Sequence, residues 1–260
     1  MTENSKIKRI FISGTGIDNI TFENVVKKVK NAVEYGNLLH IVTPNVDHII
    51  KLQYDSEFKK VYENASLVLA DGMPLLWAAR FLGTPLKEKI SGSDLFLRLC
   101  ALAAEKKYKL FFLGGRPGSA LKTAEVLKSK YPEIRIADVY SPPFGFEKAE
   151  GENRKIIKMI KDAKPDILFV GLGMPKQEKW ISKYHGEYQA PVSTGIGAGF
   201  EFVSGVVKRA PVWMQKTGFE WLWRLMMEPR RLWKRYIIDD MKFFWLVFKQ
   251  KIKQREYSDG

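Results

Sequence analysis

The sequence predicts an α/β fold, in which a mostly parallel sheet carries helices on both faces and is followed by a helical C-terminal appendage. Over residues 8–200, short apolar runs alternate with stretches whose apolar residues recur at helical spacing. This alternation is typical of strand–helix–strand units and therefore of a parallel sheet covered on both faces. With 260 residues, 45% of them hydrophobic, the chain can form one substantial core.

Seven apolar runs are expected to form the strands. They are the segments 10–14, 38–44, 67–72, 109–115, 134–140, 166–173 and 190–197. The clearest helix begins after Thr21, whose hydroxyl suits an N-cap and which precedes apolar residues at helical spacing. A second helix is expected to begin near Ser91 or Ser93, and a third follows Pro117.

The sequence pattern changes after Arg209, beyond which no further strand is predicted. Residues 211–228 and 230–255 are predicted to form two helices, separated at Pro229 because the residue before a proline avoids helical geometry. We therefore divide the chain into an α/β core over 1–207 and a basic, aromatic helical appendage over 208–260.

The positive charge of the chain is concentrated in this appendage. The whole chain has a formal net charge of +14, and the stretch from Lys208 to Arg255 has 13 Lys/Arg residues against four Asp/Glu. Five of the seven tryptophans lie in the same stretch. Such a patch predicts an anionic partner, which is a phosphate-bearing substrate, nucleic acid or anionic lipid.

Aromatic and basic residues alternate at helical spacing over residues 230–253, which is typical of a helix that lies in a membrane interface. The alternative is a helix that packs on the protein's own core or on a second subunit of a homo-oligomer. The two interpretations can coexist, since one appendage could lie on the membrane and also close a site on the core.

Several classes of site are disfavoured by composition. The single cysteine, Cys100, lies in an apolar run and is expected to be a buried thiol, so a disulfide or a Cys-rich zinc site is not predicted. The three histidines lack zinc-binding spacing, and no Asp-x-Asp motif is present, so we expect neither a metal nor a cofactor. No signal peptide or membrane-spanning run of about 18 apolar residues is predicted, which fits a cytoplasmic protein.

Polar residues follow the predicted strands, where open parallel sheets bind their ligands. Asp71 ends an apolar strand, and partial burial there would raise the pKa of its carboxyl and suit it as a general base. The alternative is a turn aspartate that caps the helix at Pro74. Asp94 is a similar but less persuasive candidate.

Two glycine-containing turns are candidate phosphate sites, because glycine lets a backbone approach a phosphate closely and helix N-termini offer free N–H groups. The first turn contains Gly114, Gly115 and Arg116, and the second contains Gly171, Gly173 and Gln177. The alternatives are an ordinary strand–helix turn for the first and a capped helix start with a solvated Glu178 for the second.

Taken together, these segments resemble the WecG/TagA/CpsF glycosyltransferase family. The matching segments are TPNVDHI (43–49), ADGMPLLWAARFLG (70–83), SGSDLF (91–96), FFLGGRPGS (111–119), PDILFVGLGMPKQEKW (165–180), TGIGAGFEFVSG (194–205) and KRAPVWMQKTGFEWLWRLMMEPRRLWKRY (208–236). They occur in order across nearly the whole chain.

The resemblance implies a Rossmann-like sheet and an inverting, metal-independent enzyme that transfers a sugar from a UDP-sugar to a sugar on a polyprenyl diphosphate. For the TagA branch this means N-acetylmannosamine added to N-acetylglucosamine (GlcNAc) in teichoic acid synthesis, at the inner face of the cell membrane. Met73 and Pro74 stand where many members have glycine after the ADG-x motif, so glucose or N-acetylmannosaminuronate, for an exopolysaccharide, remain alternative donor sugars.

The resemblance also implies roles for individual residues. Asp71 would be the catalytic base, Thr43 and Asn45 would line the reacting site, and Gln177 would hold the donor. Arginines of the appendage would neutralise the departing diphosphate, since arginine is a permanent cation with a planar fork of donors. The candidates are Arg209, Arg224, Arg230, Arg231 and Arg235.

Two other classes of protein are alternatives to a glycosyltransferase. A nucleic-acid-binding protein would explain the basic, aromatic appendage but not Asp71 or the glycine turns. A dinucleotide-dependent oxidoreductase would need the glycine fingerprint after the first strand, and the sequence there is SGTGIDNI, without the third glycine and the downstream acid in register. We therefore expect no nucleic-acid partner.

Overall fold

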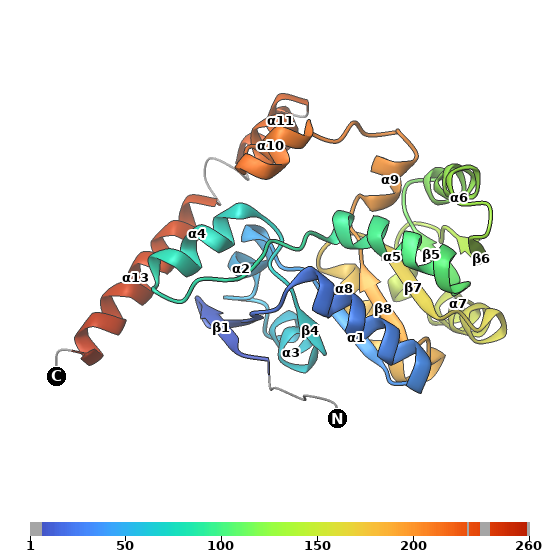
Figure 1. The fold of residues 1–260 in the computed structure, drawn as a ribbon, viewed down its shortest axis with the longest axis horizontal. Helices are drawn as coiled ribbons and strands as arrows, with labels where there is room; N and C mark the ends of the chain where they lie inside the picture. The colour runs from blue at the N-terminus through green and yellow to red at the C-terminus, as the bar shows by residue number, and fades with distance from the viewer. Residues whose placement is uncertain (1–6, 228, 235–239, 259–260) are drawn as a thin grey trace.

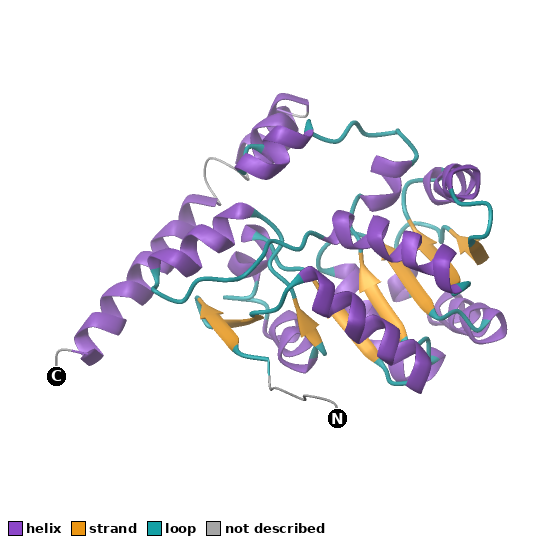
Figure 2. Cartoon of the chain, viewed as in Figure 1, coloured by secondary structure: helices purple, strands orange, loops and turns teal. Residues whose placement is uncertain are grey.

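The computed structural model describes residues 7–227, 229–234 and 240–258 of the chain. Its centre is a six-stranded sheet in the order β4-β3-β8-β7-β5-β6 (Figures 1 and 2). The strands are β3 (Leu39–Val42), β4 (Leu67–Val68), β5 (Lys109–Gly114), β6 (Arg135–Tyr140), β7 (Ile167–Gly171) and β8 (Val192–Gly195). Every neighbouring pair is parallel, so the expected α/β fold is confirmed.

Helices cover both faces of this sheet (Figure 2). One face packs against α1 (Phe22–Tyr35), α5 (Gly92–Lys106) and α6 (Ser119–Lys130). The other face packs against α2 (Val46–Lys51), α3 (Ser56–Asn64), α4 (Met73–Phe81), α7 (Glu150–Ala163) and α8 (Lys176–Tyr188). Thr21 caps α1 as predicted, since its hydroxyl accepts from the backbone N–H of Asn24, and Ser91 rather than Ser93 caps α5.

Alternating side chains of the central strands supply the two cores. In β5, Leu110 and Phe112 pack toward one set of helices, whereas Phe111 and Leu113 pack toward the other. Successive strand residues point to opposite faces, so a strand buried on both faces has a continuous apolar sequence. All four side chains are fully buried, which explains why residues 110–113 are all apolar.

The first predicted strand does not join the parallel sheet, which corrects the expectation for segment 10–14. β1 (Arg9–Ile12) and β2 (Thr15–Asp18) form a separate antiparallel hairpin. Ser13 and Gly14 both have positive φ, 49° and 79°, which suits a two-residue hairpin turn and returns the chain at once instead of through a helix.

The first of the two helices predicted for the appendage is divided, and the second falls partly on residues 235–239, which lie outside the described residues. The described helices are α10 (Val212–Thr217), α11 (Glu220–Met227), α12 (Pro229–Lys234) and α13 (Asp240–Ser258). The predicted helix 211–228 is wrong at Gly218, which has φ 86° and ends α10 in the left-handed conformation that glycine adopts easily. None of the described helices is long and apolar enough to span a membrane.

The last helix of the appendage packs on the body of the protein. Phe243 and Val247 of α13 are buried in the same apolar cluster as α2 and α4, and α13 lies alongside α4 in Figure 1. The amide of Gln250 accepts from the backbone N–H of Ser13 and donates to the carbonyl of Phe11, at 2.6 and 2.8 Å. The predicted packing alternative therefore holds for one face of α13, while the division at residue 207 stays a prediction.

Candidate functional site

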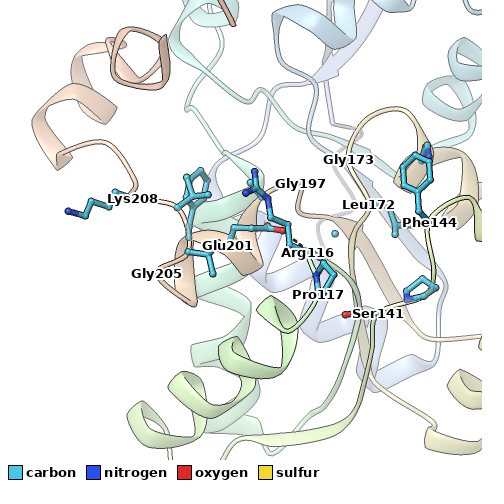
Figure 3. Close-up of a pocket in the computed structure, with 18 of the residues that line it drawn as sticks. Arg116, Pro117, Ser141, Phe144, Leu172, Gly173, Gly197, Glu201, Gly205 and Lys208 are labelled. Atoms are coloured by element: carbon cyan, nitrogen blue, oxygen red, sulfur yellow. Dashed lines mark hydrogen bonds between the residues drawn. The ribbon is translucent and has the colours of Figure 1, made fainter. Parts of the chain in front are cut away.

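The carboxyl ends of the central strands line two adjoining cavities. The first, of about 620 Å³, is lined by Thr43, Asn45, Asp71 and Gln177 among others, and we call it the Asp71 cavity. The second, of about 970 Å³, is lined by both predicted glycine turns, and we call it the Arg116 cavity (Figure 3). The two share the lining residues Gly173, Gly197, Ala198, Phe202 and Glu220, so they form one continuous site.

Asp71 stands where the chain leaves β4. Its backbone N–H donates to the carbonyl of Pro44, and its Oδ2 accepts from the backbone N–H of Gly92 at 3.3 Å. Helix α4 instead has Gly72 as its N-cap, without a side-chain hydrogen bond, so Asp71 does not cap the helix. The alternative interpretation of Asp71 as a capping residue is therefore wrong.

The surroundings of Asp71 favour the protonated carboxyl. Burial, and then the negative charge of Glu220, raise its pKa to about 6, against opposing effects of the Gly92 N–H, His48 and Lys89. A carboxyl with a pKa near neutrality can exchange a proton with a substrate hydroxyl at physiological pH. Asp71 therefore combines a place on the cavity wall with a raised proton affinity.

Asp94 has the opposite environment. Ser91 donates to its Oδ2 at 2.6 Å, and Arg209 Nη2 donates to its Oδ1 at 2.7 Å. Although burial of Asp94 acts in the opposite direction, the Ser91 hydrogen bond and the Arg209 guanidinium hold its pKa below the usual value. Asp94 is therefore a fixed anion that binds Arg209, rather than a second candidate base.

Thr43 and Asn45 follow β3 on the wall of the Asp71 cavity. Asn45 is the N-cap of α2, where its Oδ1 accepts from the backbone N–H of His48 at 3.3 Å and lies 2.7 Å from Nδ1 of the same residue. Thr43 Oγ1 would lie 3.0 Å from a Cβ placed on Gly92, so the start of α5 packs tightly against Thr43. Both residues are thus placed at the site predicted for them.

Gln177 joins two of the strand-end turns. Its Oε1 accepts from the backbone N–H groups of Gly173 and Gly197, both at 3.1 Å, and its Nε2 donates to Glu178 Oε1 at 2.8 Å. Both ends of its amide are therefore engaged within the protein. Glu178 is only 2% exposed, and α8 has Pro175 as its N-cap with no side-chain bond, so the alternative of a capped helix start with a solvated Glu178 is wrong.

The glycine turns bring β5 and β7 close together. The N–H of Gly115 donates to the carbonyl of Gly171 at 2.7 Å. A Cβ on Gly114, which has φ 95°, would fall 2.7 Å from the oxygen of Gly171. Gly115, Gly171 and Gly173 line the Arg116 cavity, whereas Gly114 is placed behind them at the strand contact.

The Arg116 cavity has charged groups on one wall and an aromatic ring on the other (Figure 3). The backbone N–H of Arg116 donates to Oε1 of Glu201 at 2.8 Å. Glu201 is 6% exposed, and among the described residues its Oε2 has no hydrogen-bond partner. On the other side, the fully exposed ring of Phe144 is contacted by Lys176, whose ammonium lies 4.7 Å from the ring centroid.

Helix α11 of the appendage covers both cavities. Glu220 lines both of them, Trp221 lines the Asp71 cavity, and Trp223 and Met227 line the Arg116 cavity. Sequence reasoning missed Glu220, although it is the single acidic residue over 208–227, which is a usable signal. It also missed His48, Glu178 and Glu201, which nothing in the spacing distinguishes from solvated residues.

The predicted arginines of the appendage have different placements. Arg209 binds Asp94, and its Nε lies 3.9 Å from Glu220 Oε1. Arg230 is exposed on α12 and lines neither cavity. The side chains of Arg224 and Arg231 lie outside the described part of the structure, and so does the whole of Arg235. Within the described residues, no group of three or more His, Cys, Asp or Glu residues is arranged to hold a metal ion.

Comparison with known proteins agrees with this architecture. The sequence model of the glycosyl transferase WecG/TagA/CpsF family matches residues 10–257. A protein of Staphylococcus aureus strain MW2 named N-acetylglucosaminyldiphosphoundecaprenol N-acetyl-beta-D-mannosaminyltransferase is 30% identical over 254 residues, covering 97% of this chain and 98% of the relative. A protein of the same name from Bacillus subtilis strain 168 is 32% identical over 204 residues, covering 78% and 76%. The chain therefore belongs to the WecG/TagA/CpsF family of glycosyl transferases.

Proposed function

We propose that this chain transfers N-acetylmannosamine from a UDP-sugar to GlcNAc carried on a polyprenyl diphosphate, in the synthesis of teichoic acid or a related surface polymer. The names of the two relatives support the choice of acceptor and sugar. The observation that carries the chemistry is Asp71, a carboxyl with a pKa raised to about 6 at the wall of a cavity that is continuous with a second one.

The reaction is a single displacement with inversion. Asp71 takes the proton of the acceptor hydroxyl while that oxygen forms a bond to C1 of the donor sugar. The bond from C1 to the diphosphate oxygen breaks on the opposite side, and UDP leaves with the electron pair. General-base catalysis of this kind contributes about 10²- to 10⁴-fold. The acceptor sugar accordingly occupies the Asp71 cavity, with its hydroxyl facing the base.

The Arg116 cavity is the proposed site of the nucleotide. The Phe144 ring offers a flat apolar face to a base, and Glu201 lines the cavity as the acidic residue nearest Arg116, to which its Oε1 is bound. Arg116 lines the space with positive charge, whereas Lys176 is paired there with Glu147 at 2.6 Å. The diphosphate would then lie near Gly173 and Gly197, where the two cavities meet.

Charge neutralisation without a metal is part of the proposal. Arg116 supplies a cation, which stabilises negative charge on a leaving group. The backbone N–H groups of Gly115, Gly173 and Gly197 donate within the protein and have a structural role in the two turns. Arg209 belongs to a different task here, because its contacts to Asp94 and Glu220 hold the start of α11 over the site. Arg224, Arg230 and Arg231 stay candidates for the diphosphate or for anionic lipid.

The proposed location is the inner face of the cell membrane, where the lipid-linked acceptor would be met. Exposed aromatic side chains gather on the appendage and on α4, including Trp77, Phe81, Trp213, Trp233, Trp245 and Phe248. Aromatic rings suit the headgroup boundary, and nearby basic residues attract anionic lipids.

Turnover assays with the full chain test the proposal. The expected result is transfer from UDP-N-acetylmannosamine to a polyprenyl-diphosphate-GlcNAc analogue, with the same rate in the presence of EDTA. UDP-glucose and UDP-N-acetylmannosaminuronate are the comparison donors, because Met73 and Pro74 differ from the usual pattern. Turnover with one of these donors instead would change the sugar, and loss of activity in EDTA would contradict the metal-free mechanism.

A further inference from the structure

A buried carboxylate lies directly behind the wall of the Asp71 cavity. Glu178 is 2% exposed, yet it is absent from the residues that line the cavity, whereas its neighbour Gln177 lines it. Burying a carboxylate is costly unless it is paired and hydrogen-bonded. An apolar residue would serve a packing role at this position better, so the contacts of Glu178 indicate its purpose.

Glu178 Oε1 connects two side chains that line the cavity. Gln177 Nε2 donates to it at 2.8 Å, and Nε2 of His48 lies 3.5 Å away. On the far side of the imidazole, Nδ1 of His48 lies 2.7 Å from Asn45 Oδ1. The contacts therefore run from Asn45 through His48 and Glu178 to Gln177.

The hydrogen-bond roles in this set of contacts are partly fixed. Asn45 Oδ1 is an acceptor, because it also accepts from the backbone N–H of His48. Nδ1 of His48 lies 2.7 Å from that oxygen and 3.4 Å from the backbone N of Asn45, so the ring keeps a contact with Asn45 in either tautomer. The imidazole therefore lies between Asn45 and Glu178 and joins them.

The contacts of Gln177 fix the direction in which its amide faces. Its Nε2 must face the carboxylate, so its Oε1 is directed at the backbone N–H groups of Gly173 and Gly197. These two glycines line both cavities, where the proposed donor and acceptor meet. If Glu178 is removed, Gln177 Oε1 keeps its two backbone donors, but Nε2 loses its acceptor, so the side chain is held at only one end of its amide.

We propose that Glu178 is a positioning residue that holds Asn45, Gly173 and Gly197 in their reactive arrangement through His48 and Gln177. The network joins the ends of β3, β7 and β8, which are neighbours in the sheet order, so three separate turns are held as one unit. The inference rests on the proposed function in one respect, which is that sugar transfer is the reaction these residues serve. The contacts themselves do not depend on the substrate.

The kinetic test uses the full chain with UDP-sugar and a lipid-linked acceptor analogue. Glu178→Ala is expected to lower kcat/KM by about 10- to 100-fold, the effect of misplacing reacting groups by about an ångström. Glu178→Gln keeps an oxygen that can accept from Gln177 and is expected to be intermediate. Because Glu178 acts partly through Gln177 and partly through His48, the double variant Glu178→Ala with Gln177→Ala should lose less than the product of the two single losses. Fully independent, multiplying effects of the two substitutions would overturn the inference.

A second measurement reports the positioning without any turnover. Hydrogen–deuterium exchange of the segments 171–178 and 195–201 should be faster in Glu178→Ala, because the acceptor of the Gly173 and Gly197 amides is no longer fixed. The matched control is Asp166→Ala, which removes a carboxylate that accepts from the backbone N–H of Lys109 at the opposite edge of the sheet. That control should leave exchange in both segments and kcat/KM unchanged.

The outcomes separate this inference from the proposed function. If the wild-type chain transfers no sugar but Glu178→Ala loosens both segments, the function is wrong and the positioning role stands. If the wild-type chain transfers sugar but Glu178→Ala and Glu178→Gln show native kinetics and native exchange, the positioning role is wrong.

Discussion

Glu220 of α11 lines the same cavity as Asp71 at the end of β4, and its negative charge is the second largest cause of the raised pKa of Asp71, after burial. Two carboxylates in one enclosed site favour retention of a proton. Arg209 lies 3.9 Å from Glu220 and is itself held by Asp94, so the appendage is attached to the core where it acts on the candidate base.

This relationship predicts the pH dependence of the reaction. A base must be deprotonated, so kcat/KM should fall on the acidic side with a midpoint near pH 6, the pKa of Asp71. Glu220→Gln removes a negative charge, which favours the carboxylate form of Asp71, lowers its pKa and moves the midpoint toward lower pH. A pH profile of kcat/KM measures this directly. Glu57→Gln, which breaks a surface pair with Lys179, is the control and should keep the midpoint.

Asp71→Asn is predicted to lose about 10²- to 10⁴-fold in turnover, because the amide cannot take the proton of the acceptor hydroxyl. UDP affinity, measured by titration calorimetry, should change little, since Asp71 lines the other cavity. Normal turnover by this variant would exclude Asp71 as the base. Loss of both turnover and UDP binding would point to a disrupted site, which thermal unfolding would reveal.

The parts of the site that could be predicted from the sequence are those set by sheet geometry. Asp71, Thr43, Asn45 and Gln177 all follow apolar strands, and the carboxyl ends of parallel strands meet at one edge. The pattern of apolar runs therefore placed them together without knowledge of the strand order. The same reasoning failed for segment 10–14, because a two-residue turn at Ser13 and Gly14 outweighs an apolar pattern that fits either kind of sheet.

The supporting residues could not be predicted, for a physical reason. Glu178 has charged and polar neighbours on α8, and Glu201 is the single charged residue of the short helix 199–203, so periodicity assigns both to the solvent. Their burial follows from contacts with Gln177 and with the N–H of Arg116, which depend on how three turns converge. Glu220 lies over the site because the chain turns at Gly218, between α10 and α11. The pattern of apolar residues did not predict that turn.

Gly195 at the end of β8 is predicted to tolerate no side chain. A Cβ there would fall 2.9 Å from Cγ of Gln177 and still closer to its amide. Gly195→Ala should therefore displace Gln177, lower stability by roughly 1–3 kcal/mol as overpacking does, and reduce turnover. Gly195→Ala combined with Gln177→Ala should recover stability in thermal unfolding but not activity. A single variant with native kinetics would contradict the role of Gln177.

Phe243 of α13 is predicted to stabilise the whole protein. Its side chain is fully buried beside α2 and α4, so Phe243→Ala should lower the free energy of unfolding by about 3–5 kcal/mol. Phe244 is its neighbour and is 47% exposed, so Phe244→Ala should change stability by about 0.5 kcal/mol or less. Urea unfolding measures the free energy of unfolding of both variants and so tests whether α13 is part of the folded core. Equal, small effects would mean that α13 only rests on the core.

The outer face of α13 is predicted to bind membranes while its inner face binds the core. Trp245 and Phe248 are 56% and 48% exposed, their rings are stacked at 6.1 Å, and Lys249 lies over the Trp245 ring. Replacing both aromatic residues with serine should weaken binding to vesicles containing phosphatidylglycerol by roughly tenfold or more, because the rings can no longer enter the headgroup boundary. Stability and turnover of a water-soluble acceptor analogue should be retained, since neither side chain lines a cavity.

The matched control is the pair Tyr35→Ser and Leu38→Ser, which are exposed at the end of α1, far from α13 in Figure 1. This pair should bind vesicles as the wild type does, and the wild type should bind phosphatidylcholine vesicles more weakly, because the basic appendage has no anionic lipid to attract. If both pairs of substitutions bind alike, α13 is not the membrane-facing helix. If single-stranded RNA competes fully with the anionic vesicles at matched salt, the basic surface binds phosphate groups in general. Nucleic acid would then again be a candidate partner for the appendage. The two cavities under α11 would be unaffected, because they are not part of that surface.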